Sequence, residues 1–442
     1  MQPTDWLELD RRHVWHPYTQ AKTAPPPLPV VRAEGAWLEL ADGRRLIDGI
    51  SSWWVTLHGH AEPRLALAAA RQAAKLEQVI FAGFAHEPAA RLAAALVERA
   101  PAGLDRVFYS DDGSTAVEVA LKMAVQQWRH RGQPQRSVFV ALEHAYHGDT
   151  FGAMAASGGA LFRGAFEELL CEVRHVPVPA TEAEVSRCAA QLETVLERDG
   201  DRIAAVIVEP IVQAAGGMRF HPPEFLRAVR AATARRGIPL VADEVFTGFG
   251  RTGRMFACEH AGIAPDLMCL SKGLTGGFLP LGATLASAEI HAAFLADDRT
   301  RTFFHGHSYT ANPIACAVAL ESLALLDERR ALERVAELER LFRARLERLA
   351  ALPAVAATRA LGALAVLELA PAGARPAAGG YLDPRGPALQ RELLERGVFL
   401  RPLGDVVYFL PPYGITDTDC HFVFDALEAE LAALGAAPDG SG

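Results

Sequence analysis

The stretch that decides the fold is Ile238-Pro239-Leu240-Val241-Ala242-Asp243-Glu244, an apolar run that ends in two acidic residues. A second apolar run, 267–270, is followed by Ser271-Lys272-Gly273. Short, nearly continuous apolar runs are typical of strands buried on both faces of a parallel sheet. Open α/β sheets bind their ligands beyond the carboxyl ends of such strands. We therefore expect Asp243 and Lys272 to face one site.

An aspartate and a lysine in this arrangement suit pyridoxal phosphate (PLP). That cofactor needs an amine to hold its aldehyde and a carboxylate to keep its ring nitrogen protonated, so that the ring can take up electrons. We assign the amine to Lys272 and the carboxylate to Asp243. The other lysines, Lys22, Lys75 and Lys122, lie in a Pro-rich loop or on polar helical faces. The alternative is a strand-end aspartate that caps a turn, with an exposed lysine nearby.

The composition favours a soluble protein with a small-molecule substrate. The chain has 442 residues, 50% of them hydrophobic, which is enough for a large core and two domains. Its net charge of -9 is spread without acidic or basic blocks, so we expect neither nucleic acid nor a membrane surface as a partner. The six cysteines show no CxxC pair and no metal-ligand spacing, which predicts no metal site, no disulfide framework and a cytoplasmic location. We also expect no signal peptide and no membrane-spanning helix.

Helical and strand patterns alternate along the chain. In the helical stretches apolar residues recur every three or four positions, and the strands between them are short and nearly all apolar. The expected helices cover about 62–78, 89–99, 115–128, 223–235 and 312–349. The expected strands cover 107–109, 137–141, 204–208, 240–242 and 267–270. This alternation predicts an α/β fold, with a large domain whose mostly parallel sheet is flanked by helices.

Both ends of the chain are expected to form a smaller α+β domain. Strands at 362–367 and 406–410 follow a long helix over about 321–349, which would bridge to this domain, and a hairpin over 37–48 would join it. The segment 371–387, rich in Ala, Gly and Pro, predicts a mobile loop. The expected boundaries are 1–58 for the N-terminal segment, 59–335 for the large PLP-binding domain and 336–442 for the small domain.

Asp112-Gly113-Ser114-Thr115, just before an expected helix, predicts a phosphate site. Phosphate binds backbone N–H groups and favours a helix N-terminus, whose dipole attracts anions. Gly113 allows the backbone to approach closely, and Ser114 and Thr115 offer hydroxyl donors. The alternative is an ordinary helix cap. Asp112 is unusual beside a dianion, so we expect its carboxylate to point away or to cap the helix itself.

Two further polar groups follow expected strands. Tyr146-His147-Gly148-Asp149 comes after the strand at 137–141, and Tyr146 is the residue that we expect to stack on the cofactor ring. Glu209 ends another apolar run and is expected to touch the hydroxyl side of the ring, directly or through neighbouring polar groups. Without the aspartate and the lysine, a surface aromatic in a turn would be an equally good interpretation of the first motif.

These motifs together allow a family to be recognised. The most specific ones are Val241-Ala242-Asp243-Glu244-Val245, Gly248-Phe249-Gly250-Arg251-Thr252-Gly253, Pro265-Asp266-Leu267 and Ser271-Lys272-Gly273. From Val14 to about Pro412 the sequence resembles the class III (fold type I) PLP-dependent aminotransferases. The resemblance implies transamination, with Lys272 as both tether and base and with Asp243 holding the ring nitrogen protonated.

Within the class, the sequence is most similar to the members that act in biotin biosynthesis. The supporting motifs are Trp15-His16-Pro17-Tyr18-Thr19, Ser51-Ser52-Trp53-Trp54, the stretch 146–154, Arg401-Pro402-Leu403-Gly404 and Tyr408-Phe409-Leu410-Pro411-Pro412-Tyr413. This resemblance implies conversion of 8-amino-7-oxononanoate to 7,8-diaminononanoate, with S-adenosylmethionine as the expected amino donor and lysine as the alternative. The stretch His305-Gly306-His307-Ser308-Tyr309 departs from the Gly-Pro-Thr of many S-adenosylmethionine users, so both donors stay open.

The resemblance also implies a homodimer with active sites at the subunit boundary. Gly306, His307 and Ser308 of one chain would help to bind the phosphate in the other chain, with Gly306 also beside the substrate.

The implied substrate is an apolar chain with a carboxylate at one end, and the sequence offers matching groups. Arg401 would hold the carboxylate, because a planar guanidinium can pair with it through two hydrogen bonds. Trp53, Trp54 and Tyr18 would form an aromatic slot for the methylene chain. Tyr18 is also expected to be a catalytic residue. Core packing is the alternative for the tryptophans. Neighbours on a strand point to opposite faces, so at least one of the two can be purely structural.

Three other residues are expected to contact substrate, namely Tyr146, Arg251 and Tyr408. For Arg251 a structural ion pair is the alternative. Two rival functions remain: an ω-amino acid:pyruvate or diamine aminotransferase, and a cofactor-binding regulator or inactive relative that uses the fold only for interaction.

Overall fold

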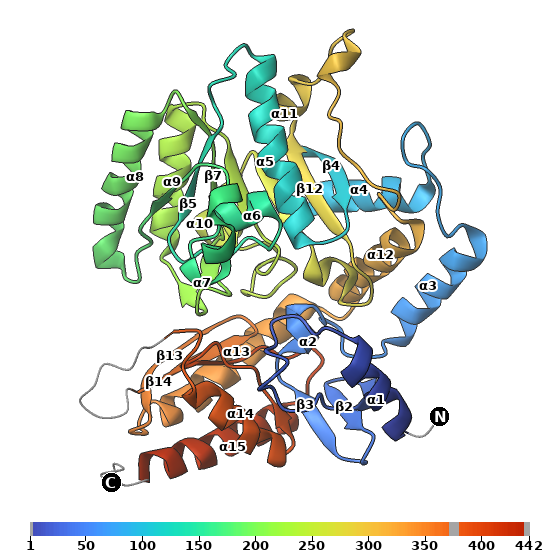
Figure 1. Cartoon of the computed structure of the whole chain (residues 1–442), viewed down its shortest axis with the longest axis vertical. Helices are drawn as coiled ribbons and strands as arrows, with labels where there is room; N and C mark the ends of the chain where they lie inside the picture. The colour runs from blue at the N-terminus through green and yellow to red at the C-terminus, as the bar shows by residue number, and fades with distance from the viewer. Residues whose placement is uncertain (1–2, 371–379, 437–442) are drawn as a thin grey trace.

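The computed structural model describes residues 3–370 and 380–436. In Figure 1 a large unit lies above a smaller one that is built from both ends of the chain. The large unit contains a seven-stranded sheet with the order β4-β12-β11-β10-β7-β5-β6. Its strands are β4 (Leu104–Ser110), β5 (Val138–Leu142), β6 (Val173–Val176), β7 (Ile203–Val208), β10 (Leu240–Asp243), β11 (Leu267–Leu270) and β12 (Gly282–Ser287).

This sheet is mostly parallel, as the sequence predicted. β10 runs parallel to β7 and β11, whereas β12 is antiparallel to its neighbours β11 and β4. Every residue of β7 is buried, and its side chains alternate between two apolar clusters: Val206 and Val208 join one, Ala205 and Ile207 the other. A sheet covered on both faces explains why its strands have nearly continuous apolar sequences.

Helices and two short strands complete the large unit. They are α3 (Pro63–Lys75), α4 (Glu87–Arg99), α5 (Gly113–His130), α6 (Phe151–Ala156), α7 (Ala160–Arg163), α8 (Val185–Asp199), β8 (Val212–Gln213), β9 (Arg219–Phe220), α9 (Pro223–Arg235), α10 (Cys258–Ala261), α11 (Ala288–Ala292) and α12 (Pro313–Glu328). Among the residues that the structure describes, no helix is long and apolar enough to cross a membrane.

The smaller unit combines an N-terminal and a C-terminal sheet. In the order β1-β2-β3-β15, strand β3 pairs in parallel with β15, which confirms that the N-terminal hairpin joins the C-terminal part of the chain. The other sheet has the order β13-β14-β16. The elements are α1 (Pro3–His13), β1 (Val30–Glu34), β2 (Trp37–Leu40), β3 (Arg45–Asp48), α2 (Ser51–Trp54), α13 (Ala331–Leu349), β13 (Val355–Leu361), β14 (Leu364–Leu369), α14 (Arg385–Glu395), β15 (Val398–Phe399), β16 (Val406–Phe409) and α15 (Asp417–Ala436). The three domain boundaries given above stay predictions.

The prediction of one long helix over 312–349 is wrong. The chain forms α12 and α13 instead, because Arg330 adopts a left-handed backbone with a φ of 48° that no helix can continue through. The bridge expected over 321–349 is therefore broken at this residue.

Two other expectations need correction at their ends. The helix expected over 62–78 ends at Lys75, because the next residue, Leu76, is extended. Of the loop expected over 371–387, residues 371–379 lie outside the described residues, and helix α14 begins at Arg385.

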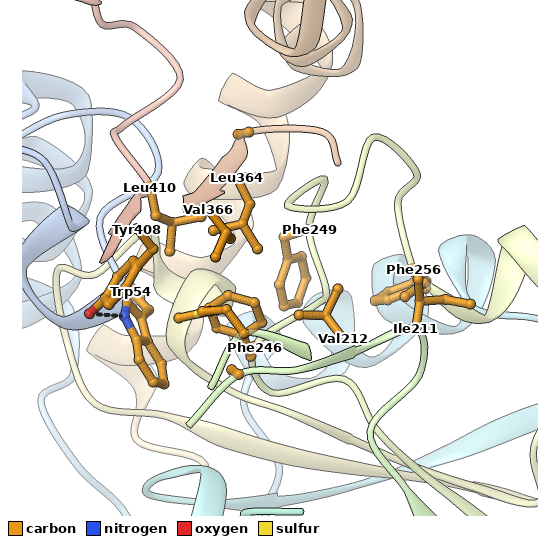
Figure 2. Packing of buried hydrophobic residues seen from close by; sticks show 14 of the residues in the cluster. Trp54, Ile211, Val212, Phe246, Phe249, Phe256, Leu364, Val366, Tyr408 and Leu410 are labelled. Carbon is orange, nitrogen blue, oxygen red and sulfur yellow. Dashed lines mark hydrogen bonds between the residues drawn. The ribbon is translucent and has the colours of Figure 1, made fainter. Parts of the chain in front are cut away.

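The two units share one apolar core. Trp54 of the N-terminal segment contacts Phe246 of the large unit and Tyr408 of β16, with ring centroids 5.1 Å and 6.1 Å away (Figure 2). Leu364 and Val366 of β14 extend the same cluster. Aromatic side chains that bridge segments distant in sequence fix those segments relative to one another. The junction between the units is therefore packed, and a cavity lies directly beside it.

Candidate active site

A cavity of about 670 Å³ opens beyond the carboxyl ends of β4, β5, β7, β10 and β11. Open α/β sheets bind ligands at this edge. The cavity wall brings together seven of the residues that the sequence singled out: Trp54, Gly113, Ser114, Tyr146, Glu209, Asp243 and Lys272. The structure thus places the proposed amine and the proposed carboxylate at one site.

Lys272 begins a short 3₁₀ turn that follows β11. Its Nζ lies 4.8 Å from the ring centroid of Trp54 and 5.7 Å from that of Phe246. Burial lowers the pKa of Lys272 to about 8, although the negative charges of Asp243 and Glu209 act in the opposite direction. About a tenth of this amine is therefore neutral at pH 7, and the neutral form is the one that can act as a nucleophile or a base.

The lowered pKa predicts how Lys272 reacts when pH is varied. In the cofactor-free full-length protein, labelling by a small neutral acylating reagent should rise about fivefold from pH 7 to 8 and level off above pH 9, because the free amine is then fully formed. The exposed Lys75, labelled in the same sample, is the internal control. Mass spectrometry of the two peptides measures both curves. Parallel curves would contradict a desolvated amine at position 272.

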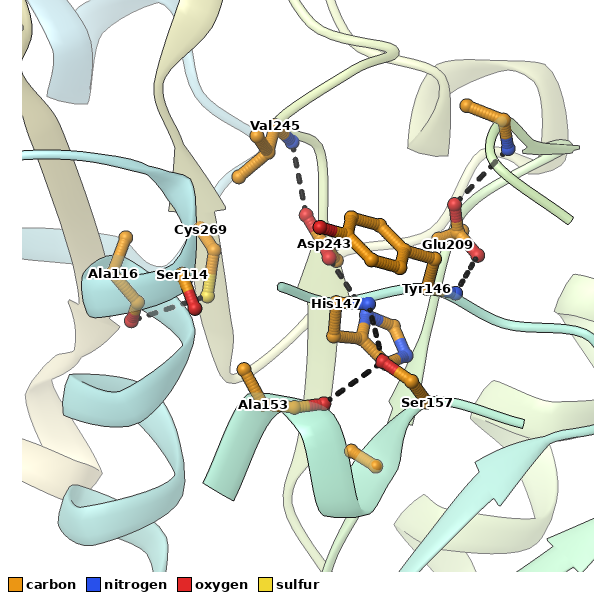
Figure 3. Close-up of polar contacts among 12 residues, drawn as sticks. Ser114, Ala116, Tyr146, His147, Ala153, Ser157, Glu209, Asp243, Val245 and Cys269 are labelled. Carbon is orange, nitrogen blue, oxygen red and sulfur yellow. Dashed lines mark hydrogen bonds and ion pairs between the residues drawn. The ribbon is translucent and has the colours of Figure 1, made fainter. Parts of the chain in front are cut away.

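Asp243 is held by a buried histidine (Figure 3). One carboxylate oxygen of Asp243 lies 2.6 Å from Nδ1 of His147, and the other accepts from the backbone N–H of Val245 at 3.1 Å. Burial alone would lower the pKa of His147, but the hydrogen bond and charge of Asp243 and the charge of Glu209 raise it overall. The Nε2 of His147 has no hydrogen-bond partner in the described part of the chain. The pair fixes a carboxylate at the base of the cavity.

His147 is a site residue that the sequence reasoning missed. His147 belongs to the same tetrapeptide as Tyr146, the residue expected to stack on the cofactor ring. Its position directly after that expected ligand contact could have indicated a site residue. Its backbone N–H donates to Ser157 Oγ at 2.9 Å, which fixes the loop that also carries Tyr146 (Figure 3).

Glu209 lies buried beside this pair. Its two carboxylate oxygens accept from the backbone N–H groups of Tyr146 at 3.0 Å and Ala214 at 3.1 Å. Burial raises the pKa of Glu209 to about 7, although the charge of His147 acts to lower it. Glu209 therefore positions the Tyr146 loop in this structure. Its contact with a cofactor hydroxyl stays a prediction.

The N-terminus of α5 forms one end of the cavity. Asp112 caps the helix, because its carboxylate accepts a hydrogen bond from the N–H of Thr115 at 2.8 Å. This confirms the expectation that the Asp112 carboxylate caps the helix itself. The Thr115 hydroxyl donates to the Asp112 carbonyl at 3.0 Å in this structure, and its contact with phosphate stays a prediction. Ser114 Oγ lies 2.7 Å from the Thr150 hydroxyl and faces the cavity wall. A Cβ on Gly113 would come within 2.5 Å of a methyl group of Val245, so a larger residue here would force the Val245 side chain to move.

An aromatic and basic cluster of Tyr18, Trp53 and Arg401 does not itself line the cavity but adjoins it through the lining residues Tyr146 and Asp149. The hydroxyl of Tyr18 lies 3.0 Å from that of Tyr146 and also donates to Asp149. The ring of Trp53 packs edge-on against Tyr18 at 5.5 Å, and the Arg401 guanidinium lies 4.5 Å from the Trp53 ring centroid. Burial, followed by the hydrogen bond to Asp149, raises the pKa of Tyr18 to about 12. Within residues 3–370 and 380–436, Arg401 forms no salt bridge, which leaves its guanidinium able to bind an anion.

Tyr408 and Arg251, both expected to contact substrate, lie behind the cavity wall and hydrogen-bond to residues near it. The Tyr408 hydroxyl accepts from Trp54 Nε1 at 2.9 Å, and the Arg251 guanidinium donates to the carbonyls of Pro411 at 3.1 Å and of Trp54 and Thr56 at 3.3 Å. Both side chains are 1% exposed and neither lines the cavity. Long-range packing of the C-terminal segment covers both side chains, and the substrate contacts expected for Tyr408 and Arg251 stay predictions.

The segment that contains Gly306, His307 and Ser308 lies at the rim of the cavity. Nε2 of His307 pairs with the carboxylate of Asp111 in the same chain, and the Ser308 carbonyl accepts from Gln78 Nε2 at 2.7 Å. Asp111 lines the cavity. The contacts expected with a second chain stay a prediction.

The fold and the site define a class of enzyme. The chain belongs to the class-III aminotransferases, because the family model "Aminotransferase class-III" matches residues 18–431. It is therefore an aminotransferase. One similar protein is the adenosylmethionine-8-amino-7-oxononanoate aminotransferase of Synechococcus elongatus, 52% identical over 422 residues that cover 94% of this chain and 97% of the relative. The Geobacter sulfurreducens protein of the same name is 42% identical, with coverage of 97% and 96%.

Solved structures agree with this assignment. The crystal structure of adenosylmethionine-8-amino-7-oxononanoate aminotransferase from Methanocaldococcus jannaschii superposes with a TM-score of 0.91 at 34% identity, covering 98% of this chain and 100% of that one. An (S)-enantioselective omega-transaminase from Thermomicrobium roseum reaches a TM-score of 0.91 at 32% identity, covering 99% of both chains. These likenesses confirm the predicted fold type I architecture.

Proposed function

We propose that this aminotransferase uses PLP to convert 8-amino-7-oxononanoate to 7,8-diaminononanoate in biotin biosynthesis, with S-adenosylmethionine as amino donor. The names of the similar proteins support the substrate and the donor. The observation in the structure that carries the proposal is a single cavity lined by the Lys272 amine, the Asp243 carboxylate and the Trp54 ring. The six free cysteines support a reducing, cytoplasmic location.

The residues of the cavity fit PLP. Gly113 and Ser114 at the N-terminus of α5 would hold the phosphate, and Tyr146 would stack on the ring. Asp243 would face the ring nitrogen and Lys272 the aldehyde. When bound, PLP supplies a carbonyl that accepts an amino group and a ring that takes up the electrons released at the neighbouring carbon.

The protein's own part in the reaction is to move protons and to hold charge. Burial lowers the pKa of Lys272, so part of its Nζ is neutral and can act as a base. This base removes a proton from the α-carbon of the amino donor in the first half of the reaction, and it delivers a proton to the keto carbon of 8-amino-7-oxononanoate in the second half. His147 fixes the Asp243 carboxylate in place, and the negative charge of this carboxylate would stabilise a protonated ring nitrogen beside it. Trp54 and Phe246 border Nζ and exclude water from the amine.

Arg401 would bind the substrate carboxylate, with Trp53, Trp54 and Tyr18 along the methylene chain. Replacing Arg401 by Ala should raise KM for 8-amino-7-oxononanoate by about 30- to 5,000-fold, since losing a buried charge pair costs about 2–5 kcal/mol. Arg401→Met, which keeps the length of the side chain without its charge, should behave alike. The exposed Arg396→Ala, whose partner is Glu430, is the control. Steady-state kinetics measure the effect, and an unchanged KM would remove Arg401 from the substrate site.

The chain is further proposed to work as a homodimer. Ile80, Phe84, Phe304 and Tyr309 are 61% to 74% exposed, which leaves apolar surface that a second subunit could cover. In a dimer, Gly306, His307 and Ser308 would reach the phosphate site of the other subunit. Sedimentation equilibrium measures the assembly, and a monomer at micromolar concentration would contradict this part of the proposal.

Transamination assays on the purified protein test substrate and donor together. Formation of 7,8-diaminononanoate with S-adenosylmethionine supports the full proposal, and formation with lysine alone replaces the donor. Likeness to the omega-transaminase structure makes an ω-amino acid:pyruvate or diamine aminotransferase the second candidate. Turnover of β-alanine or putrescine without turnover of 8-amino-7-oxononanoate would favour that candidate.

A further inference from the structure

The turn that carries the two tryptophans has a strained backbone. In α2 (Ser51–Trp54), Ser51, Ser52 and Trp54 have φ values of 52°, 62° and 70°. Non-glycine residues at positive φ are uncommon and persist only where their surroundings hold them in place. This shape sends Trp54 into the cavity over Lys272 and Trp53 outward beneath Arg401. Something must therefore fix the turn.

Asp48 is the group that does so. It ends β3 and is 0% exposed. One of its carboxylate oxygens accepts from the N–H of Ile50 at 3.2 Å, and the other accepts from the N–H of Ser52 at 2.5 Å and lies 2.8 Å from Nε2 of His60. Two backbone donors, one directly before the strained turn and one within it, thus converge on one side chain.

A carboxylate is the side chain that this position requires. Three donors converge on two acceptor oxygens, and the amide of an asparagine would replace one of these oxygens by a donor. A buried carboxylate also needs a partner, and His60 supplies a donor from a side chain that is 15% exposed. His60 is itself anchored, because its backbone pairs with that of Gly35 in both directions.

We infer that Asp48, backed by His60, is a positioning residue that holds Trp53 and Trp54 in the orientation that the substrate chain requires. The identity of that substrate rests on the proposed function, whereas the hold on the turn does not. Asp48 touches neither the cavity nor a reacting atom, so it acts through the tryptophans alone.

Kinetics of Asp48→Asn test the inference. KM for 8-amino-7-oxononanoate should rise about 10- to 100-fold, because small misplacements of positioning groups have effects of this order. The accompanying fall in kcat should be smaller than the rise in KM, and it should arise from the lost shielding of Lys272. Asp42→Asn is the matched control. Asp42 is an exposed aspartate of the same hairpin, its side chain hydrogen-bonds only to Arg44 within the described part of the chain, and its replacement should leave both constants unchanged.

A second substitution separates positioning from a general loss of stability. Ser52→Gly removes the strain at this position, since glycine adopts positive φ freely. Ser52→Gly alone should leave KM within about twofold of the wild type. The double variant Asp48→Asn with Ser52→Gly should recover most of the KM lost in Asp48→Asn. Failure of the glycine to restore KM would overturn the inference.

Lys272 provides a readout that needs no substrate. In cofactor-free Asp48→Asn, withdrawal of Trp54 should expose Nζ to water and move the midpoint of Lys272 acylation above pH 8, and Ser52→Gly should move it back. A shifted midpoint without any turnover of 8-amino-7-oxononanoate by the wild type would support the positioning role and refute the proposed function. An unshifted midpoint together with a wild-type KM would refute the positioning role.

Discussion

Lys272→Ala is expected to lower the rate of transamination by at least about 10⁴-fold. General-base catalysis alone contributes about 10²–10⁴-fold, and the variant also loses the amine that would hold the cofactor. The fold should tolerate the change, because the side chain faces the cavity and forms no salt bridge within the described residues. Single-turnover kinetics with saturating donor measure the effect on chemistry directly.

Lys272→Arg and Lys75→Ala make this prediction specific. An arginine keeps the positive charge but is never deprotonated in proteins, so it should be as inactive as the alanine variant. Lys75 is an exposed lysine on α3 whose one ion pair among the described residues is with Glu87, and its removal should leave the rate unchanged. Residual activity of the arginine variant above about a tenth of the wild type would show that position 272 supplies charge rather than a base.

Asp243→Asn is expected to lower kcat by about 30- to 5,000-fold. The variant keeps the size of the side chain and an oxygen to accept from Val245, but it loses the charge that favours a protonated ring. Removing one member of a buried, hydrogen-bonded charge pair costs about 2–5 kcal/mol. Cofactor affinity and thermal stability should change much less than kcat, and comparing the three quantities separates an electronic effect from a structural one.

His147→Gln is the companion variant. It leaves the charge of Asp243 in place and removes only the ring that holds it, so its kcat should lie between those of the wild type and Asp243→Asn. An Asp243→Asn enzyme within about threefold of wild-type kcat would refute the proposed role of this carboxylate.

The central strands and the two main chemical groups could be predicted because their signals are local. Buried strands such as 204–208 have apolar sequences that hardly any other structure requires, and the polar residues that follow them mark one edge of a parallel sheet. Strand β12 has the sequence Gly-Ala-Thr-Leu-Ala-Ser, which carries little strand preference. Its place between β4 and β11 depends on pairing with residues far away in the chain.

The missed features depend on contacts that sequence spacing does not encode. Arg330 breaks the expected helix although no Gly or Pro marks the position, so only its left-handed backbone reveals the break. Arg251 and Tyr408 are residue types suited to a substrate site, yet packing against the C-terminal segment buries both. The strained turn that Asp48 holds contains serines rather than glycines, so the sequence does not indicate a backbone with positive φ there.

The central claim is that Lys272 and Asp243 act on one PLP ring. A crystal structure of the protein with bound PLP tests it most directly. We expect the aldehyde carbon to be bonded to Nζ of Lys272, and the ring nitrogen to lie within hydrogen-bonding distance of the Asp243 carboxylate. A ring attached to another lysine, or one whose nitrogen faces away from Asp243, would contradict the account.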